Sequence, residues 1–394
     1  MFASRTNRSL TPNRLSQLIE ERRQQGLPLL DLTESNPTRC GFNFDAEKLL
    51  GALADPRALG YEPDPRGLLA ARLAVADYYA ERGVQLEPAQ IFLTTSTSEA
   101  YSYVFRLLAN PGEAVLVPRP SYPLFDFLAG LNDVHLAPYP LAYHDGWRIE
   151  LETLAAVLDS SLRQVRAIVV VHPNNPTGSF VSREELECLL KHCEDHALAL
   201  VADEVFADCA FAPDDERVVS HAGISGALTF TLSGLSKISA LPQMKLAWVV
   251  VNGPPDVLSK ALARLEVIAD TYLSVSVPLA LALPTMLETR HSLQPQVLER
   301  ARTNLHWLDE QLAADLPVRH LKADGGWYAI LKLPAIRSDE DWAVELLTGD
   351  GVFVHPGHFY DFLSEGHLVV SLLPPVEIFQ QGIRKLLARV SRYG

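Results

Sequence analysis

The chain contains the stretch Ala167-Ile168-Val169-Val170-Val171-His172-Pro173-Asn174-Asn175-Pro176-Thr177-Gly178. Its continuous apolar run predicts a strand buried on both faces, as in a parallel sheet. The asparagines, prolines and glycine that follow predict a turn. Because parallel sheets bind ligands at the carboxyl ends of their strands, this turn is also a candidate ligand-binding loop.

Similar apolar runs recur on either side, separated by segments with helical spacing. The predicted strands are Ile91–Thr95, Ala114–Pro118, Asp133–Leu136, Ala197–Ala202, Leu228–Leu232 and Leu246–Val251. The predicted helices include Gly67–Arg82, Glu99–Leu108 and Ser182–His196. Strands that alternate with helices favour βαβ units, so we expect an α/β fold whose large domain has a mostly parallel sheet flanked by helices.

The pattern changes after about residue 275. The elements predicted there are a helix at Pro295–Leu312, strands at Ala329–Leu333, Val352–His355 and Leu368–Leu373, a helix capped by Ser338, and a last helix at Val376–Tyr393. We therefore expect a smaller α+β domain at 281–394 and a large domain at 46–280. Residues 1–45 are expected to form an N-terminal arm that belongs to the small domain.

The composition excludes several classes of protein. Of the 394 residues, 48% are hydrophobic and 21% are charged, which is typical of a folded globular protein. The 34 basic residues against 48 acidic ones give a net charge of −14, so we expect no binding to nucleic acid or to membranes. None of the four cysteines forms a CxxC pair, which predicts reduced thiols in a cytoplasmic protein.

Two further loops carry reactive side chains directly after predicted strands. Asp203 follows the apolar run Ala197–Val201, where a buried carboxylate needs a cation or hydrogen-bond donors. Lys237 ends Ser233-Gly234-Leu235-Ser236-Lys237, where small residues can hold an amine for Schiff-base chemistry. Taken singly, such an acidic residue could equally cap a helix or bind a metal, and such a lysine could be a solvated surface charge.

Asn175, Asp203 and Lys237 follow one another at separations of 28 and 34 residues, each after a predicted strand. In this order the chain resembles class I/II aminotransferases, which are fold type I pyridoxal-phosphate-dependent enzymes, from about Asp31 to the C-terminus. The resemblance implies that Lys237 forms a Schiff base with pyridoxal 5'-phosphate and later moves a proton. It implies that Asp203 pairs with the pyridinium nitrogen and that Asn175 donates to the phenolic oxygen.

The resemblance also implies how the rest of the cofactor is held. Ser96-Thr97-Ser98, where a strand meets a helix, matches the segment that binds the phosphate. Ser236 and Lys245 would add a hydroxyl and a cation to that phosphate. Tyr122 matches the aromatic residue that stacks on the pyridine ring.

Two segments point beyond the cofactor. Tyr61 resembles the tyrosine that reaches the phosphate of the neighbouring subunit, so a homodimer with shared active sites is implied. Ser35-Asn36-Pro37 resembles the strand that closes over the substrate, which makes Asn36 a candidate substrate contact together with Asn175.

The chain departs from the family pattern at the cofactor. Phe206 stands where a tyrosine usually donates to the phenolic oxygen, so we expect a raised pKa for the Schiff base. Lys245 replaces an arginine and therefore loses the bidentate fork. Tyr61 lies one residue further from Gly67 than the usual spacing.

The departure with the largest consequence lies near the C-terminus. Val369, two residues before Ser371, occupies the place of the arginine that usually binds the substrate α-carboxylate. Either another cation binds that group or the substrate lacks it. Three arginines lie in segments near the expected site: Arg39, which we assign to substrate binding, Arg66 and Arg119.

We therefore expect a pyridoxal-phosphate-dependent transaminase of amino-acid metabolism and biosynthesis, acting on a small amino donor and a keto or aldehyde acceptor. The alternative is a lyase, decarboxylase or other non-transaminase on the same fold. A purely binding function, as in effector domains of transcription regulators, would need a DNA-binding module and is disfavoured by the acidic charge. His355 and His358 are expected to line the pocket, and we expect no metal site.

Overall fold

The computed structural model describes residues 1–7, 11–61, 63–273, 275–312 and 316–393. Its centre is an eight-stranded sheet in the order β2-β9-β8-β7-β6-β3-β4-β5. These strands are β2 (Ile91–Thr94), β3 (Ala114–Arg119), β4 (His135–Tyr143), β5 (Trp147–Ile149), β6 (Val165–Val171), β7 (Ala199–Asp203), β8 (Thr229–Gly234) and β9 (Ala247–Asn252). The pairs from β8 to β4 are parallel, whereas β9 pairs antiparallel with β2 and β8, and β5 with β4. The expected mostly parallel sheet is confirmed.

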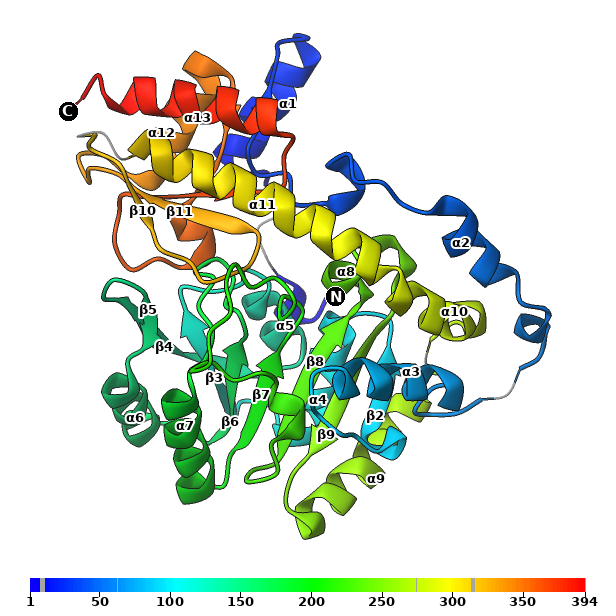
Figure 1. The fold of residues 1–394 in the computed structure, drawn as a ribbon. Coiled ribbons are helices and arrows are strands. Elements are labelled where there is room, and N and C mark those ends of the chain that lie inside the picture. The colour runs from blue at the N-terminus through cyan, green and yellow to red at the C-terminus, as the bar shows by residue number, and fades with distance from the viewer. Residues whose placement is uncertain (8–10, 62, 274, 313–315, 394) are drawn as a thin grey trace.

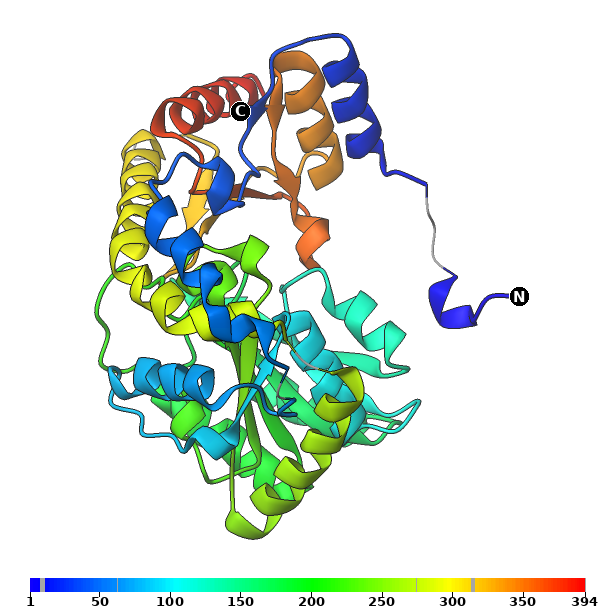
Figure 2. The same ribbon diagram turned by 90° about the vertical axis from the view of Figure 1, so that its right-hand side faces the viewer.

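Helices cover both faces of this sheet (Figures 1 and 2). They are α3 (Leu69–Ala80), α4 (Thr97–Leu108), α5 (Phe125–Leu131), α6 (Leu151–Ser160), α7 (Arg183–His196), α9 (Pro255–Tyr272) and α10 (Val277–Glu288). Two short helices, α2 (Ala46–Gly51) and α8 (Leu235–Ile238), contact α10. Ser182 caps α7 with its side chain and forms a reciprocal capping box with Glu185. The sequence analysis predicted no element for α2, β5, α5, α6, α8, α9 or α10.

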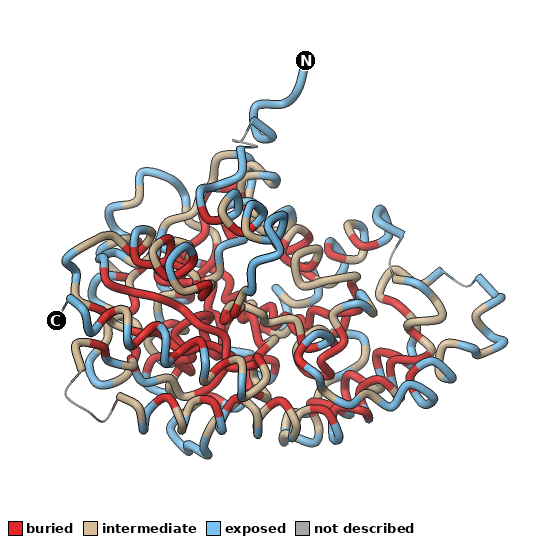
Figure 3. The backbone as a smooth tube through the Cα atoms, turned by 90° about the horizontal axis from the view of Figure 1, so that it is seen from above, coloured by how far each residue is buried: buried red, intermediate tan, exposed pale blue. Residues whose placement is uncertain are grey.

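Strand β6 shows why its sequence is apolar throughout. Ala167, Val169 and Val171 pack in one core with residues of α4, α5 and α9. Ile168 and Val170 face the other way, into a core shared with α6 and α7. Because successive side chains alternate between the two faces, neither face leaves room for a polar residue. Figure 3 shows the same pattern, with buried backbone in the middle and exposed segments around it.

Two strand predictions are wrong. The segment Val352–His355 is not one strand, because it is divided between β12 (Val352–Phe353) and β13 (His355–Pro356), which belong to different sheets. We expected Asp133–Leu136, but β4 begins at His135 and continues to Tyr143. Pro138 and Pro140 lie inside this strand, and prolines usually argue against a central strand because they donate no ladder hydrogen bond. Parallel pairing with β3 and antiparallel pairing with β5 extend β4 past both prolines.

The smaller domain contains a four-stranded antiparallel sheet in the order β10-β11-β14-β13. Its strands are β10 (Arg319–Leu321), β11 (Tyr328–Lys332), β13 (His355–Pro356) and β14 (His367–Ser371). Its helices are α1 (Arg14–Gln24), α11 (Arg290–Leu312), α12 (Asp339–Glu345) and α13 (Val376–Val390). Strand β1 (Leu30–Asp31) pairs with β12 (Val352–Phe353), which attaches the N-terminal arm to this domain. Helix α11 begins five residues before the predicted Pro295, which lies inside it.

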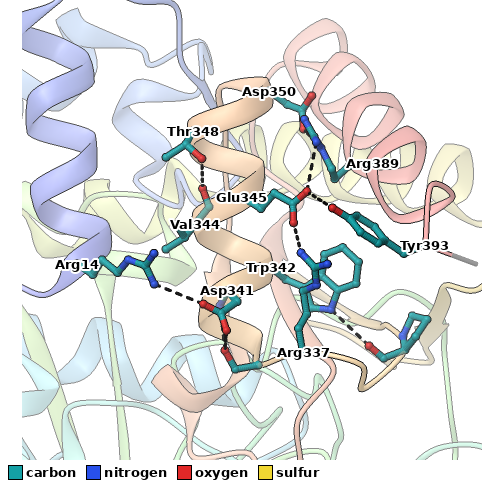
Figure 4. Close-up of polar contacts among 12 residues, drawn as sticks. Arg14, Arg337, Asp341, Trp342, Val344, Glu345, Thr348, Asp350, Arg389 and Tyr393 are labelled. Atoms are coloured by element: carbon teal, nitrogen blue, oxygen red, sulfur yellow. Dashed lines mark hydrogen bonds and ion pairs between the residues drawn. The ribbon is translucent and has the colours of Figure 1, made fainter.

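Ion pairs fasten the helices of the small domain to one another (Figure 4). The carboxylate of Glu345 contacts Arg337, and its Oε1 accepts from Arg389 at 3.2 Å and from the Tyr393 hydroxyl at 2.7 Å. Arg389 also donates from Nε to Asp350 at 2.7 Å. These contacts join α12, the π-helical turn after it and α13.

Among the described helices, none taken alone has the length and hydrophobicity to cross a membrane; α9 and α10, bent by 119°, reach that threshold only as a pair.

Candidate active site

The loops with the predicted reactive residues leave the large sheet at one edge. The register of β6, β7 and β8 aligns Val171, Asp203 and Leu232 side by side. The loops that carry Asn175 and Lys237 therefore start beside Asp203. This is the carboxyl edge of the parallel strands, where such sheets bind ligands.

Lys237 lies in α8, directly after β8. Its Nζ is 4.8 Å from the ring centroid of Trp327 and 5.4 Å from that of Phe206. Burial lowers the pKa of its amine from 10.5 to about 8, because an ammonium loses hydration there. A substantial fraction of the amine is therefore neutral near pH 8, as a nucleophile requires.

Asp203 ends β7 and is buried. The Tyr101 hydroxyl donates to its Oδ2 at 3.1 Å, and the Val205 amide donates to its Oδ1 at 3.1 Å. Burial raises the pKa of this carboxyl from 3.8 to about 6, while both hydrogen bonds and the charge of Lys237 act in the opposite direction. The site therefore presents a carboxylate that a cationic ligand atom would stabilise.

Asn175 stands in a loop that is locked by its neighbour. The Asn174 side chain donates to the Pro120 carbonyl at 3.1 Å and to Thr177 Oγ1 at 2.9 Å. Asn175 itself is buried, and its Oδ1 has no hydrogen-bond partner in the described part of the chain. A buried amide oxygen without a partner is unusual and leaves this side chain for a ligand.

Tyr122 lies past the end of β3 and is largely buried. Burial, followed by the charge of Asp203, raises the pKa of its hydroxyl to about 12. Together with Arg119, His355, His358 and Tyr360, Tyr122 lines a cavity of about 370 Å³. Both predicted histidines therefore lie where the predicted stacking residue meets the small domain.

The candidate phosphate-binding residues gather at the same edge. The register aligns Thr94 of β2, Ala247 of β9 and Gly234 of β8. Ser96 and Ser236 lie two residues after the ends of β2 and β8, and Lys245 lies two residues before the start of β9. Ser96 caps α4 by accepting from the Glu99 amide at 3.1 Å. Helix N-termini bind anions through backbone amides that have no partner within the helix. In α4, which begins at Thr97, these include the amides of Thr97 and Ser98. Lys245 is exposed and has a φ of 50°.

The wall over Lys237 includes Trp327, which the sequence analysis missed as a site residue. Its Nε1 donates to Cys209 Sγ at 3.1 Å. The loop before it passes so close to the large domain that a Cβ on Gly325 would lie 2.5 Å from the Cys209 carbonyl oxygen, and a Cβ on Gly178 would lie 2.3 Å from the Gly325 carbonyl oxygen. Gly325-Gly326-Trp327-Tyr328 was the available sequence signal, since adjacent glycines permit such an approach.

Three further tyrosines were missed. Tyr101 is the hydrogen-bond donor to Asp203. The ring centroid of Tyr328 lies 6.3 Å from that of Tyr360. Burial raises the pKa of the Tyr328 hydroxyl, and a hydrogen bond from Ser35 of the arm partly offsets this increase. No sequence pattern marked Tyr101 or Tyr360, because both become site residues only through packing.

The three candidate arginines differ in solvent exposure and in the distance to the nearest carboxylate. Arg39 has 73% of its side chain exposed and lies 3.8 Å from Glu34, while Asn36 caps the 3₁₀ turn that carries it. Arg66 pairs with Glu266 at 2.6 Å. Arg119 donates from Nε to the Asp361 carbonyl at 2.9 Å, but its NH2 is 4.0 Å from the Asp361 carboxylate. Arg119 is therefore the one of these three arginines that lines the Tyr122 cavity, and its ion pair, with Asp361, is the longest of the three.

Val369 is fully buried in β14, opposite Ile330 of β11 and His355 of β13. His355 shares a 3.1 Å hydrogen bond with the Tyr360 hydroxyl, and burial lowers its pKa to about 4. At neutral pH this surface therefore carries no cation at position 369 or at its neighbour on β13.

Tyr61 lies away from these contacts within the chain. It is 72% exposed and lines a different cavity together with Gly67, Leu273 and Val275. In the described ranges, no cluster of three or more histidine, cysteine, aspartate or glutamate side chains is placed to hold a metal ion.

Comparison with known proteins agrees with this geometry. The family model for aminotransferase class I and II matches residues 30–378. The chain is 28% identical over 384 residues to the glutamate-pyruvate aminotransferase AlaA of Haemophilus influenzae, covering 94% of this chain and 92% of that protein. It is 28% identical over 388 residues to an alanine aminotransferase of Mycobacterium bovis, covering 94% and 86%.

Solved structures show the same fold. An aminotransferase from Escherichia coli superposes with a TM-score of 0.86 at 25% identity, covering 99% of this chain and 98% of that one. An alanine aminotransferase from Pyrococcus furiosus superposes with a TM-score of 0.87 at 20% identity over the full length of both chains. The relatives named here are aminotransferases, and none supports the lyase or decarboxylase alternative. The chain belongs to the aminotransferase class I and II family, has its fold type I architecture, and is a transaminase.

Proposed function

We propose that this transaminase uses pyridoxal 5'-phosphate attached to Lys237 to move an amino group from an amino donor to a keto or aldehyde acceptor. The observation that carries the proposal is the convergence of a lysine with a depressed pKa and a buried aspartate with a raised pKa at one sheet edge.

The residues present fit this cofactor. Asp203 is a buried carboxylate that a protonated ring nitrogen would satisfy. The buried Asn175 side chain has an amide oxygen without a hydrogen-bond partner among the described residues. The amide can therefore rotate so that its NH2 group donates to the phenolic oxygen, and the amide oxygen loses no hydrogen bond. The N-terminus of α4 suits a phosphate.

The chemistry divides between cofactor and chain. When bound, pyridoxal phosphate supplies a carbonyl carbon for the amine and a ring that accepts the electron pair released at the substrate Cα. Lys237 takes the proton from that Cα and returns one to the acceptor, which its pKa of about 8 permits near neutral pH. Asp203 holds a proton on the ring nitrogen, and Trp327 and Phe206 exclude water around the lysine.

We further propose that Arg119, and not Arg39, binds the substrate carboxylate. Arg119 lines the Tyr122 cavity, whereas the Arg39 side chain is mostly exposed. Val369 leaves the usual position of that cation apolar.

A homodimer completes the proposal. Large apolar side chains are exposed in and beside the short turn Pro56–Leu59 and helix α9, among them Leu59, Tyr61, Val267 and Leu273. Exposed apolar surface of this kind suits a second copy, which would bring Tyr61 to its partner's phosphate.

The remaining assignments are proposals of the same kind. We assign 1–45 to the arm, 46–280 to the cofactor-binding domain and 281–394 to the small domain. The β1–β12 pair, which attaches the arm to the small domain, supports the first assignment. Helix α10 packs against α3 along its length up to Leu287, so we propose that the cofactor-binding domain continues past 280 to the end of that helix at Glu288. Free cysteines support a cytoplasmic location, and the named relatives support amino-acid metabolism.

The test is to locate the cofactor. Protein loaded with pyridoxal phosphate is reduced with borohydride, digested and analysed by mass spectrometry. We expect the pyridoxyl group on the peptide containing Lys237, and none there in K237A. Modification confined to exposed lysines such as Lys245 would contradict the proposal.

A further inference from the structure

A second cavity, of about 610 Å³, lies where the β4–β5 hairpin faces the small domain. Figure 1 shows β4 and β5 beneath β10 and β11, so the cavity has one wall from each domain. Of the residues that line the Tyr122 cavity, Arg119 alone also lines this one among the described residues.

The small-domain wall carries two cationic side chains, Arg319 and Lys332, in a row with His367, whose pKa is lowered to about 4 by burial and which is therefore neutral at neutral pH. The register pairs Arg319 of β10 with Lys332 of β11, and Lys332 with His367 of β14. Directly paired residues project from the same face of a sheet, and all three residues line the cavity. Like charges in directly opposite positions destabilise a sheet. The Arg319–Lys332 pair is therefore not explained by the stability of the fold.

The row is also not neutralised by close acids. Lys332 Nζ donates to the Glu365 carbonyl at 2.7 Å, and His367 Nδ1 contacts the Ser364 carbonyl at 2.8 Å. Burial lowers the pKa of Lys332, and the charges of Asp339 and Glu365 only partly oppose this decrease. Burial, and then the charge of Lys332, lowers the pKa of His367.

This arrangement runs against the composition of the chain, whose net charge is −14. Asp145 is the one acidic residue on the cavity wall among the described residues. An accumulation of basic groups that opposes both sheet stability and overall charge is typical of a binding site.

Aromatic rings from both domains line the rest of the cavity. The Trp147 ring lies 5.3 Å from Tyr143 and 6.0 Å from Phe362, so an aromatic contact joins the two domains here. Phe362 stacks on His367 at 4.3 Å. Trp147 Nε1 is buried without a hydrogen-bond partner among the described residues, and so is Nε2 of His320, whose residue also lines the cavity.

The cavity is separated from the active-site tyrosines. Ile330 and Val369 are paired on the same sheet face, between the Lys332–His367 pair and the Tyr328–Ser371 pair. Both are fully buried, so an apolar barrier lies between the basic row and Tyr328.

We propose that this cavity binds a small organic anion with an aromatic body, whose carboxylate meets Arg319 and Lys332 and whose ring packs against Trp147 and Phe362. Binding to the cavity does not depend on the proposed function.

The test uses the full chain loaded with pyridoxal phosphate and isothermal titration calorimetry at low ionic strength. The ligands are indole-3-acetate, its neutral amide indole-3-acetamide, and inorganic phosphate. We expect the carboxylate to bind at least about tenfold more tightly than either of the others, because it alone has both charge and ring. Equal binding of the amide or of phosphate would overturn the proposal.

Variants locate the ligand. R319Q and K332Q should each weaken binding of indole-3-acetate by about fivefold, and R319E by more. R148Q is the matched control, since Arg148 adjoins Trp147 on β5 but lies outside the cavity lining, and it should bind normally. Unfolding temperatures check the fold: K332Q without ligand should be at least as stable as the wild type, because a like-charge neighbour is removed.

Two results would refute the site. One is unchanged binding in the R319Q/K332Q double variant. The other is simple competition with the amino donor, seen as an increased KM at constant kcat, which would place the anion in the active site. If the chain catalysed no amino transfer at all, the calorimetric result would still decide the binding site.

Discussion

Replacement of Lys237 by methionine should stabilise the cofactor-free protein. The pKa of Lys237 is lowered from 10.5 to about 8 by burial, which corresponds to roughly 3 kcal/mol disfavouring its ammonium in the folded state. Part of the side chain stays accessible, so solvent screening reduces this to about 1–2 kcal/mol. K237M removes the buried charge and retains most of the volume.

The pH dependence gives the prediction its sign. A lysine with a depressed folded-state pKa destabilises the fold fully below about pH 8, and this effect disappears as the pH rises toward 10.5. K237M should therefore unfold a few degrees above the wild type at pH 7, and the difference should vanish near pH 10.5.

Thermal unfolding of both cofactor-free proteins across this range is the assay, and K260M, at an exposed lysine in α9, is the control and should change nothing. Equal unfolding temperatures at pH 7, or a difference that grows with pH, would refute the reasoning.

Three other substitutions test individual contacts. Y101F removes the hydrogen-bond donor to Asp203 and should raise the pKa of that carboxyl further. Cofactor binding should weaken about tenfold in a fluorescence titration at pH 7, whereas unchanged affinity would show that the hydrogen bond does not contribute to binding. R119Q should raise KM for a carboxylate donor about tenfold with little change in kcat, and a kcat effect alone would argue against a binding role. F206Y restores a hydroxyl near Lys237 and should lower the pH at which the visible band of the bound cofactor titrates, whereas an unmoved midpoint would mean that the hydroxyl does not reach the cofactor.

The sequence predicted the elements whose patterns are local. The apolar runs of β6, β7 and β8 are buried on both faces, and their loops were correctly placed at one sheet edge. The extension of β4 through Pro138 and Pro140 was missed, since pairing partners distant in sequence determine where that strand ends.

The unpredicted parts of the site are created by tertiary packing. Trp327 reaches Lys237 because glycines at 178 and 325 allow two loops from different domains to touch. Tyr101 meets Asp203 across 102 residues of chain. The basic row of Arg319 and Lys332 is likewise invisible in the sequence, because only the strand register aligns it.

The most direct test of the central claim is a single-turnover balance of the amino group. Protein loaded with pyridoxal phosphate is mixed with L-alanine or L-glutamate, without an acceptor, and the products are quantified. We expect about one equivalent of 2-oxo acid per active site with the amino group retained on the enzyme, and its release to an added 2-oxo acid. K237A should give neither step. Formation of free ammonia or carbon dioxide in place of a retained, transferable amino group would contradict the account.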